Sequence, residues 1–146
     1  MLQRVVRAGL ITGVIDGLFS SILVSLFYGS TVARLWQGVA STVFGQGAPA
    51  SAGVLMHFGV AFAWSIVFAL LYLRSAFLHS VLTRWRGVLA VACIYGPLIW
   101  LFMSLVVIPL LTKRPPNIGF RWLVQLIGHA PFVGLPIVAS IREKRD

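Results

Sequence analysis

Residues 8–28 read AGLITGVIDGLFSSILVSLFY, and this stretch decides the fold. It is apolar over the ~20 residues that an α-helix needs to cross the hydrocarbon of a bilayer. Similar stretches follow at residues 52–73, 87–111 and 121–141. Each should be a helix, because lipid offers no partner for backbone N–H and C=O groups and the runs alternate too poorly for barrel strands. The sequence therefore predicts an all-α membrane protein, a bundle of four transmembrane helices.

The composition agrees with a single transmembrane domain over residues 1–146. Hydrophobic residues make up 59% of the chain and charged residues only 10%, and the chain is too short for two domains. A net charge of +9 is one mark of nucleic-acid binding, but the Lys and Arg residues cluster at the ends of the apolar stretches. This placement predicts contacts with anionic lipid headgroups and no nucleic-acid partner.

The Lys and Arg residues also predict the orientation, because cytoplasmic loops carry the excess of positive charge. The larger group, expected on one side, is Arg4, Arg7, Arg74, Arg84, Arg86, Arg142, Lys144 and Arg145. The smaller group is Arg34, Lys113, Arg114 and Arg121. We therefore expect both termini in the cytoplasm. The inverted orientation stays open because the third connection carries Lys113 and Arg114.

The longest connection, residues 29–51, has apolar residues at helical spacing. These are Leu35, Trp36, Val39, Val43 and Phe44, and Gly45-Gln46-Gly47 follows them. We predict a short interfacial helix on the outer membrane surface, between spans one and two. A functional lid over a central cavity would give the same pattern, because loops of this length are often functional.

Gly9, Gly13 and Gly17 recur every four residues in the first span. They place a groove without side chains along one helix face, where a neighbouring backbone can approach closely. The neighbour is either another span of this chain or, as the alternative, a second copy that forms a dimer. The repeat predicts a packing surface in both cases.

Asp16 is the only acidic residue before Glu143, and in its ionised form it would cost several kcal/mol at that depth. It should face the bundle interior and be protonated, accept hydrogen bonds or pair with a cation. The other spans supply His57, Tyr95, Gln125 and His129, which with Asp16 form a predicted intramembrane polar network. At ~1.5 Å per residue, Asp16, His129 and His57 lie ~12, ~18 and ~24 Å from the cytoplasmic ends, as a staggered ladder.

Four stretches carry a resemblance: ITGVIDG at 11–17, HFGVAF at 57–62, YGP at 95–97 and GHAPFVGLP at 128–136. Together they resemble small four-span bacterial membrane proteins of uncharacterised families. The resemblance implies the topology and a bacterial inner membrane, and it supplies no activity, substrate or ligand. The glycines and prolines of the last two stretches predict kinks in the third and fourth spans.

Three functions stay open. The first is a structural or accessory role as a subunit of a membrane assembly, because the chain has little mass outside the lipid and a close-packing glycine face. The second is a small proton- or ion-coupled transporter or channel that uses the Asp/His network. The third is haem or metal binding through His57 and His129; otherwise no cofactor or metal is expected. An enzyme is disfavoured, because phosphate loops, nucleophile elbows and paired carboxylates are missing from the sequence.

Overall fold

The structure is a computed structural model that describes residues 1–142, and its regular elements in that range are all helical. Four segments are long and apolar enough to cross a membrane: Leu2–Phe27, Ala50–Arg74, Trp85–Thr112 and Phe120–Ile141. The predicted four-helix membrane bundle is confirmed. Three spans agree with the prediction within two residues at each end, whereas the first begins at residue 2 instead of 8.

The first helix, α1 (Leu2–Ile22), begins early because its two arginines have partners inside the fold. The Arg7 guanidinium donates a hydrogen bond to the Ser140 carbonyl oxygen at 2.7 Å, and that of Arg4 donates to the Ile141 carbonyl oxygen at 3.4 Å. Both carbonyls belong to the last turn of the fourth span, where backbone oxygens lack helical partners. The arginines therefore join the two ends of the chain.

Three of the four spans contain a π-helical turn. The first continues from α1 into η1 (Leu23–Phe27), and the second is the unbroken α3 (Ala50–Arg74). The third consists of α5 (Trp85–Phe102), η2 (Met103–Val107) and α6 (Ile108–Thr112). The fourth consists of α7 (Phe120–His129), η3 (Ala130–Gly134) and α8 (Leu135–Ile141). Pro131 stands in η3, where the helical hydrogen-bond ladder changes because proline has no N–H.

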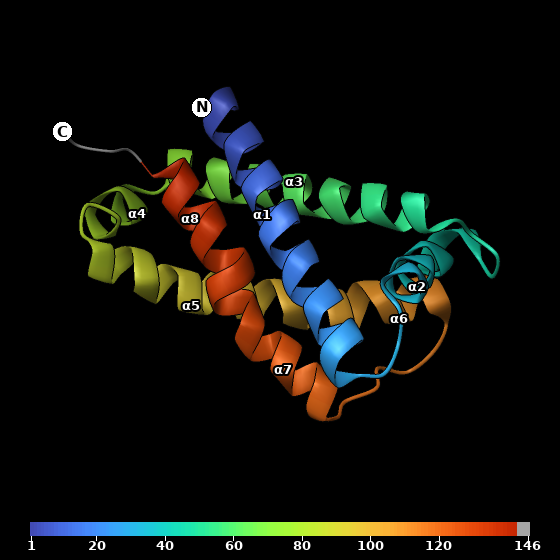
Figure 1. The fold of residues 1–146 in the computed structure, drawn as a ribbon. Coiled ribbons are helices and arrows are strands. Elements are labelled where there is room, and N and C mark those ends of the chain that lie inside the picture. Colours follow the sequence, from blue (N-terminus) through green and yellow to red (C-terminus); the bar gives the residue numbers. More distant parts are fainter. Residues whose placement is uncertain (143–146) are drawn as a thin grey trace.

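The spans pack as two crossing pairs (Figure 1). In that view α1 runs beside the fourth span, and α3 and α5 run across this pair. α1 contacts α3, η3 and α8, and α5 contacts α7, η3 and α8. The N-terminus, α4 (Ala76–Val81) and the end of α8 lie at one end of the bundle, and the connection from α6 to α7 lies at the opposite end.

The glycine face of α1 packs against α3 of the same chain. A methyl group on Gly9 would overlap the ring of Phe62, and one on Gly13 would overlap the ring of Phe58. At Gly17 it would meet His57 Nε2 at 3.5 Å and the Trp36 ring at 3.6 Å. The groove that the sequence predicts is thus filled inside the chain.

The connection between the first two spans contains the predicted short helix, α2 (Val32–Phe44). The Thr31 side chain caps it by accepting a hydrogen bond from the Arg34 N–H at 3.2 Å. α2 packs against α3, where Gly53 leaves room for the Trp36 carbonyl group, and the Trp36 side chain is buried. The helix therefore covers the bundle at this end, as the lid alternative requires.

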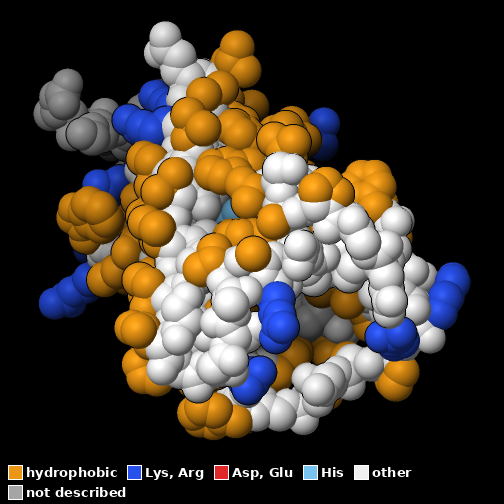
Figure 2. Space-filling view, turned by 45° about the vertical axis from the view of Figure 1, so that its right-hand side comes forward, with side chains coloured by type: hydrophobic (Ala, Val, Ile, Leu, Met, Phe, Trp, Pro, Cys, Tyr) orange, Lys and Arg blue, Asp and Glu red, His pale blue; other side chains and the backbone are white. Residues whose placement is uncertain are grey.

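Large apolar side chains are exposed along the outer faces of the spans. On α1 these are Leu10, Val14, Leu18 and Ile22, and the other spans show similar faces. Figure 2 shows hydrophobic side chains over much of one side, with Lys and Arg in separate small groups toward the margins and the lower part of that view. Exposed apolar surface of this extent suits a chain surrounded by lipid.

Replacing Gly96 with alanine should destabilise the bundle, because the added methyl would overlap the carbonyl oxygen of His129. Overpacking against backbone costs ~1–3 kcal/mol, so the Tm of the purified protein should fall by several degrees. Gly59→Ala is the matched control, because nothing lies within 4 Å of the added methyl and alanine favours the helix. Equal Tm values for the two variants would contradict the contact between α5 and the fourth span.

Candidate functional site

A cavity of about 310 Å³ lies in the middle of the bundle. All four spans and α2 contribute to it. Its polar side chains are Thr12, Asp16, Ser20, His57, Gln125 and His129, and its large aromatic ones are Trp36, Trp64 and Trp100. Figure 2 shows a histidine recessed among hydrophobic side chains. The volume is near the lower end of the ~300–1,000 Å³ typical of small-molecule sites.

Asp16 and His57 face each other where α1 packs on α3. The His57 Nε2–H donates a hydrogen bond to the Gly13 carbonyl oxygen at 3.0 Å, so in the neutral ring Nδ1 carries the lone pair. Nδ1 lies 3.9 Å from Oδ2 of Asp16. The pair can therefore share one proton, either as a carboxyl group beside a neutral ring or as a carboxylate beside an imidazolium.

The predicted depth difference between Asp16 and His57 is wrong. The early start of α1 adds about six residues between the helix start and Asp16. Measured along the helix, the carboxyl group therefore lies ~21 Å from the start instead of ~12 Å. His57 lies ~25 Å from the end of α3 by the same count. The two groups therefore meet at one level, near the middle of their spans.

His129 lies on the opposite wall of the cavity, on α7. Its Nδ1–H donates a hydrogen bond to the Gln125 carbonyl oxygen at 2.7 Å, which leaves the Nε2 lone pair of the neutral ring as an acceptor. Its ring lies against Trp100, with 4.9 Å between centroids. The Gln125 side-chain amide donates to the Ser20 hydroxyl at 3.4 Å and so links α7 to α1.

Several buried polar atoms at the cavity have no hydrogen-bond partner. Within residues 1–142 such atoms are Thr12 Oγ1, Asp16 Oδ1, Tyr28 OH, Trp100 Nε1 and Gln125 Oε1. All except the Tyr28 hydroxyl belong to residues that line the cavity. Buried polar groups are nearly always bonded, and each unpaired one costs ~1–3 kcal/mol. Their concentration around one space fits a site that holds polar guests.

The structure brings together four of the five residues of the predicted network: Asp16, His57, Gln125 and His129. Tyr95 does not line the cavity. Its hydroxyl donates a hydrogen bond to the Trp64 carbonyl oxygen at 2.7 Å, and its ring packs on Phe68 at 4.8 Å between centroids. Tyr95 therefore joins α5 to α3 as a satisfied core residue.

The tryptophans are the site residues that sequence reasoning missed. Trp36 lies 5.1 Å from His57 and Trp100 lies 4.9 Å from His129, between ring centroids, so each histidine has an indole beside it. One signal was present, because Trp64 and Trp100 stand inside apolar stretches instead of at their ends. Tryptophan in such a place is unusual for an interfacial anchor.

His57 has little capacity left for iron, whereas Nε2 of His129 is free. His57 uses Nε2 on Gly13 and turns Nδ1 toward Asp16, so an axial bond to haem iron would displace one of these contacts. In the described part of the chain no group of three His, Cys, Asp or Glu side chains is placed to hold a metal ion.

Comparison with known proteins adds no assignment: no family model, curated protein or solved structure matches this chain. The resemblance carried by the sequence motifs stays a prediction. Function is therefore argued from the cavity and its surroundings.

Replacing Ser20 with cysteine should make the cavity reactive toward the water-borne thiol reagent aminoethyl methanethiosulfonate. The substitution is made in a Cys93→Ala background, because Cys93 is exposed on α5. Ser65→Cys is the matched control, because Ser65 is buried outside the cavity and its hydroxyl bonds to the Ala61 carbonyl oxygen. Mass spectrometry should find the label on Ser20→Cys alone, and an unlabelled Ser20→Cys would show that water does not enter.

Proposed function

We propose that this chain is a small proton-coupled carrier or channel that passes a polar solute or ion through the centre of the bundle. The supporting observation is the set of partnerless buried polar atoms around a cavity that every span lines. A network that served packing alone would bond these atoms to one another, because unpaired polar groups destabilise a core. A transport site leaves them free for its guest.

The proton would be held by Asp16 and His57. The Gly13 carbonyl keeps the hydrogen of the neutral ring on Nε2, so Nδ1 is the atom that receives a proton from the carboxyl group. The 3.9 Å between Nδ1 and Oδ2 closes to hydrogen-bonding distance with a small side-chain movement or through one water. His129 offers a second acceptor, Nε2, on the opposite wall.

The packing of α1 weakens the case for an accessory subunit. That role was motivated by the small mass outside the lipid and by the glycine face, and the second motive is weakened because Phe58 and Phe62 of the same chain fill the groove. A homo-oligomer or larger complex would have to form through the lipid-facing side chains instead. We propose that membrane lipids are the partners of these faces.

We place the protein in a bacterial inner membrane with both termini cytoplasmic. The arginines at the starts of α1 and α5 and at the end of α3 lie toward the end of the bundle where α8 also ends. Lys144 and Arg145, which add to the same count, lie outside the described residues. The excess of positive charge at this end supports the orientation, and the sequence resemblance supports the bacterial membrane.

Proteoliposomes that contain the protein and a pH-sensitive dye should acidify faster than protein-free liposomes when the outside is made more acidic than the lumen, with sodium phosphate outside. Asp16→Asn should reduce the rate to the protein-free level, because the amide cannot release or take up a proton. His57→Gln and His129→Gln should each slow it at least tenfold.

His79→Gln is the matched control for the histidine variants. His79 stacks on Tyr72 in α4, away from the cavity, so its replacement should leave the rate unchanged. A parent no faster than protein-free liposomes, or full activity in Asp16→Asn, would overturn the proposal.

Reporter fusions in a bacterial host test the orientation. Green fluorescent protein fused to the C-terminus should fluoresce, and alkaline phosphatase at the same site should be inactive, because folding of the first and oxidation of the second need opposite compartments. Phosphatase fused after residue 115 should be active. The reversed pattern would establish the inverted topology.

A further inference from the structure

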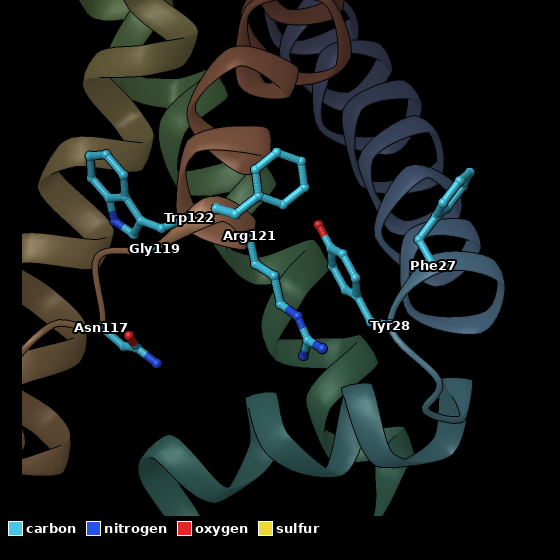
Figure 3. Close-up of a pocket in the computed structure, with 7 residues that line it drawn as sticks. Phe27, Tyr28, Asn117, Gly119, Arg121 and Trp122 are labelled. Atoms are coloured by element: carbon cyan, nitrogen blue, oxygen red, sulfur yellow. The ribbon is translucent and has the colours of Figure 1, made fainter.

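A second hollow, of about 490 Å³, adjoins the central cavity; we call it the vestibule. The residues that it shares with the central cavity are Leu35, Trp100, Ile108 and Gln125. The residues that it shares with an outer hollow of about 510 Å³ are Tyr28, Asn117, Arg121 and Trp122. The outer hollow is drawn in Figure 3 and lies where the α6–α7 connection meets the end of the first span. The three hollows therefore lie in series between this end of the bundle and Asp16, separated by the side chains that they share, and we call this series the passage.

The vestibule is lined by cations without acidic partners. Arg114 and Arg121 both line it. Asp16 is the one acidic residue among residues 1–142, and it faces His57 deeper in the bundle. The Arg121 guanidinium lies 4.3 Å from the centre of the Tyr28 ring, and Figure 3 shows the two side chains side by side. This cation–π contact holds Arg121 in place and leaves its N–H donors free for another group.

Two buried donors in the same lining also lack partners. The Tyr28 hydroxyl and the Trp100 indole N–H are buried and unbonded, and both residues line the vestibule. The indole N–H of Trp122, in contrast, has a hydrogen-bond acceptor: it donates to the Ser104 hydroxyl at 3.0 Å. Two exposed arginines and two residues with unpaired buried donors thus line one hollow, a composition that suits an anion.

We propose that the vestibule binds a small oxyanion, a carboxylate or a phosphate, as the entry site of the passage. This inference rests on the proposed function and names its substrate class. A monoanion that moves inward with one proton carries no net charge, so it avoids most of the cost of placing a charge in the hydrocarbon. The Asp16–His57 pair is placed to supply that proton beyond the vestibule. The same chemistry would also hold the phosphate of an anionic lipid headgroup.

Tryptophan fluorescence tests the site, because Trp100 and Trp122 lie in its lining. The full chain is placed in nanodiscs of phosphatidylcholine and titrated with sodium acetate or sodium phosphate at constant ionic strength, with sodium chloride as the reference. The parent should show a saturable change with at least one oxyanion. Arg114→Gln and Arg121→Gln should each weaken this binding at least tenfold.

Arg34→Gln is the matched control, because it removes the same charge at the same end of the bundle from a residue outside the three hollows. It should bind as the parent does. Tyr28→Phe keeps the ring under Arg121 and removes only the unpaired hydroxyl, so it should weaken binding with the fold intact. Equal affinity in parent, Arg114→Gln and Arg121→Gln would overturn the inference.

Nanodiscs that contain phosphatidylglycerol distinguish a bound lipid headgroup from a soluble oxyanion. If its headgroup occupies the vestibule, native mass spectrometry should find this lipid retained on the parent and lost from Arg121→Gln, and soluble oxyanions should bind only in phosphatidylcholine discs. The absence of both saturable binding and retained lipid would overturn the inference.

Asp16→Asn separates this inference from the proposed function. It should bind the oxyanion while its proton flux is lost. Flux in the parent without oxyanion binding or retained lipid would contradict the anion site and leave the transport function standing. Oxyanion binding in a parent without flux would contradict the transport function and leave the anion site standing.

Discussion

A carboxyl group in the middle of a membrane span needs a polar neighbour, and this requirement shapes the bundle around Asp16. In lipid the ionised group would cost several kcal/mol, and the neutral group would lose its hydrogen bonds. α1 therefore turns Asp16 inward, next to Gly13 and Gly17. These glycines let α3 approach until His57 reaches both the Gly13 carbonyl oxygen and the carboxyl group. The glycine face and Asp16 therefore act together to bring α3 against α1.

The same contact explains why the centre of the bundle is hollow. Polar side chains from α1, α3 and α7 meet there, and the large rings of Trp36 and Trp100 flank the two histidines instead of filling the space between them. Closer packing occurs on either side, where Gly53 receives the backbone of α2 and Gly96 receives that of the fourth span. Tight backbone contacts around an open centre keep the cavity side chains at fixed positions while several of their polar atoms stay unbonded.

Much of this arrangement follows from the sequence, because lipid makes hydropathy a strong signal. The number, type and most boundaries of the spans were predictable. So was the inward direction of Asp16, because a carboxyl group in a span is tolerated toward the bundle interior and not toward lipid. The relative depth of His57 was not, because the Arg4 and Arg7 contacts that lengthen α1 depend on the distant end of α8. Tyr95 has the same polarity as the cavity residues, and only the fold shows that its hydroxyl bonds to Trp64.

The pairing of the first two spans also bears on how the chain enters the membrane during synthesis. Asp16 finds His57, and the glycine face finds Phe58 and Phe62, within the first 74 residues. A first span alone in lipid would leave its carboxyl group and its exposed glycine backbone without neighbours. The two spans would therefore leave the insertion machinery together, as a helical hairpin in which the carboxyl group already has a polar neighbour. Spans three and four would then close the cavity around a half-site that exists before they are made.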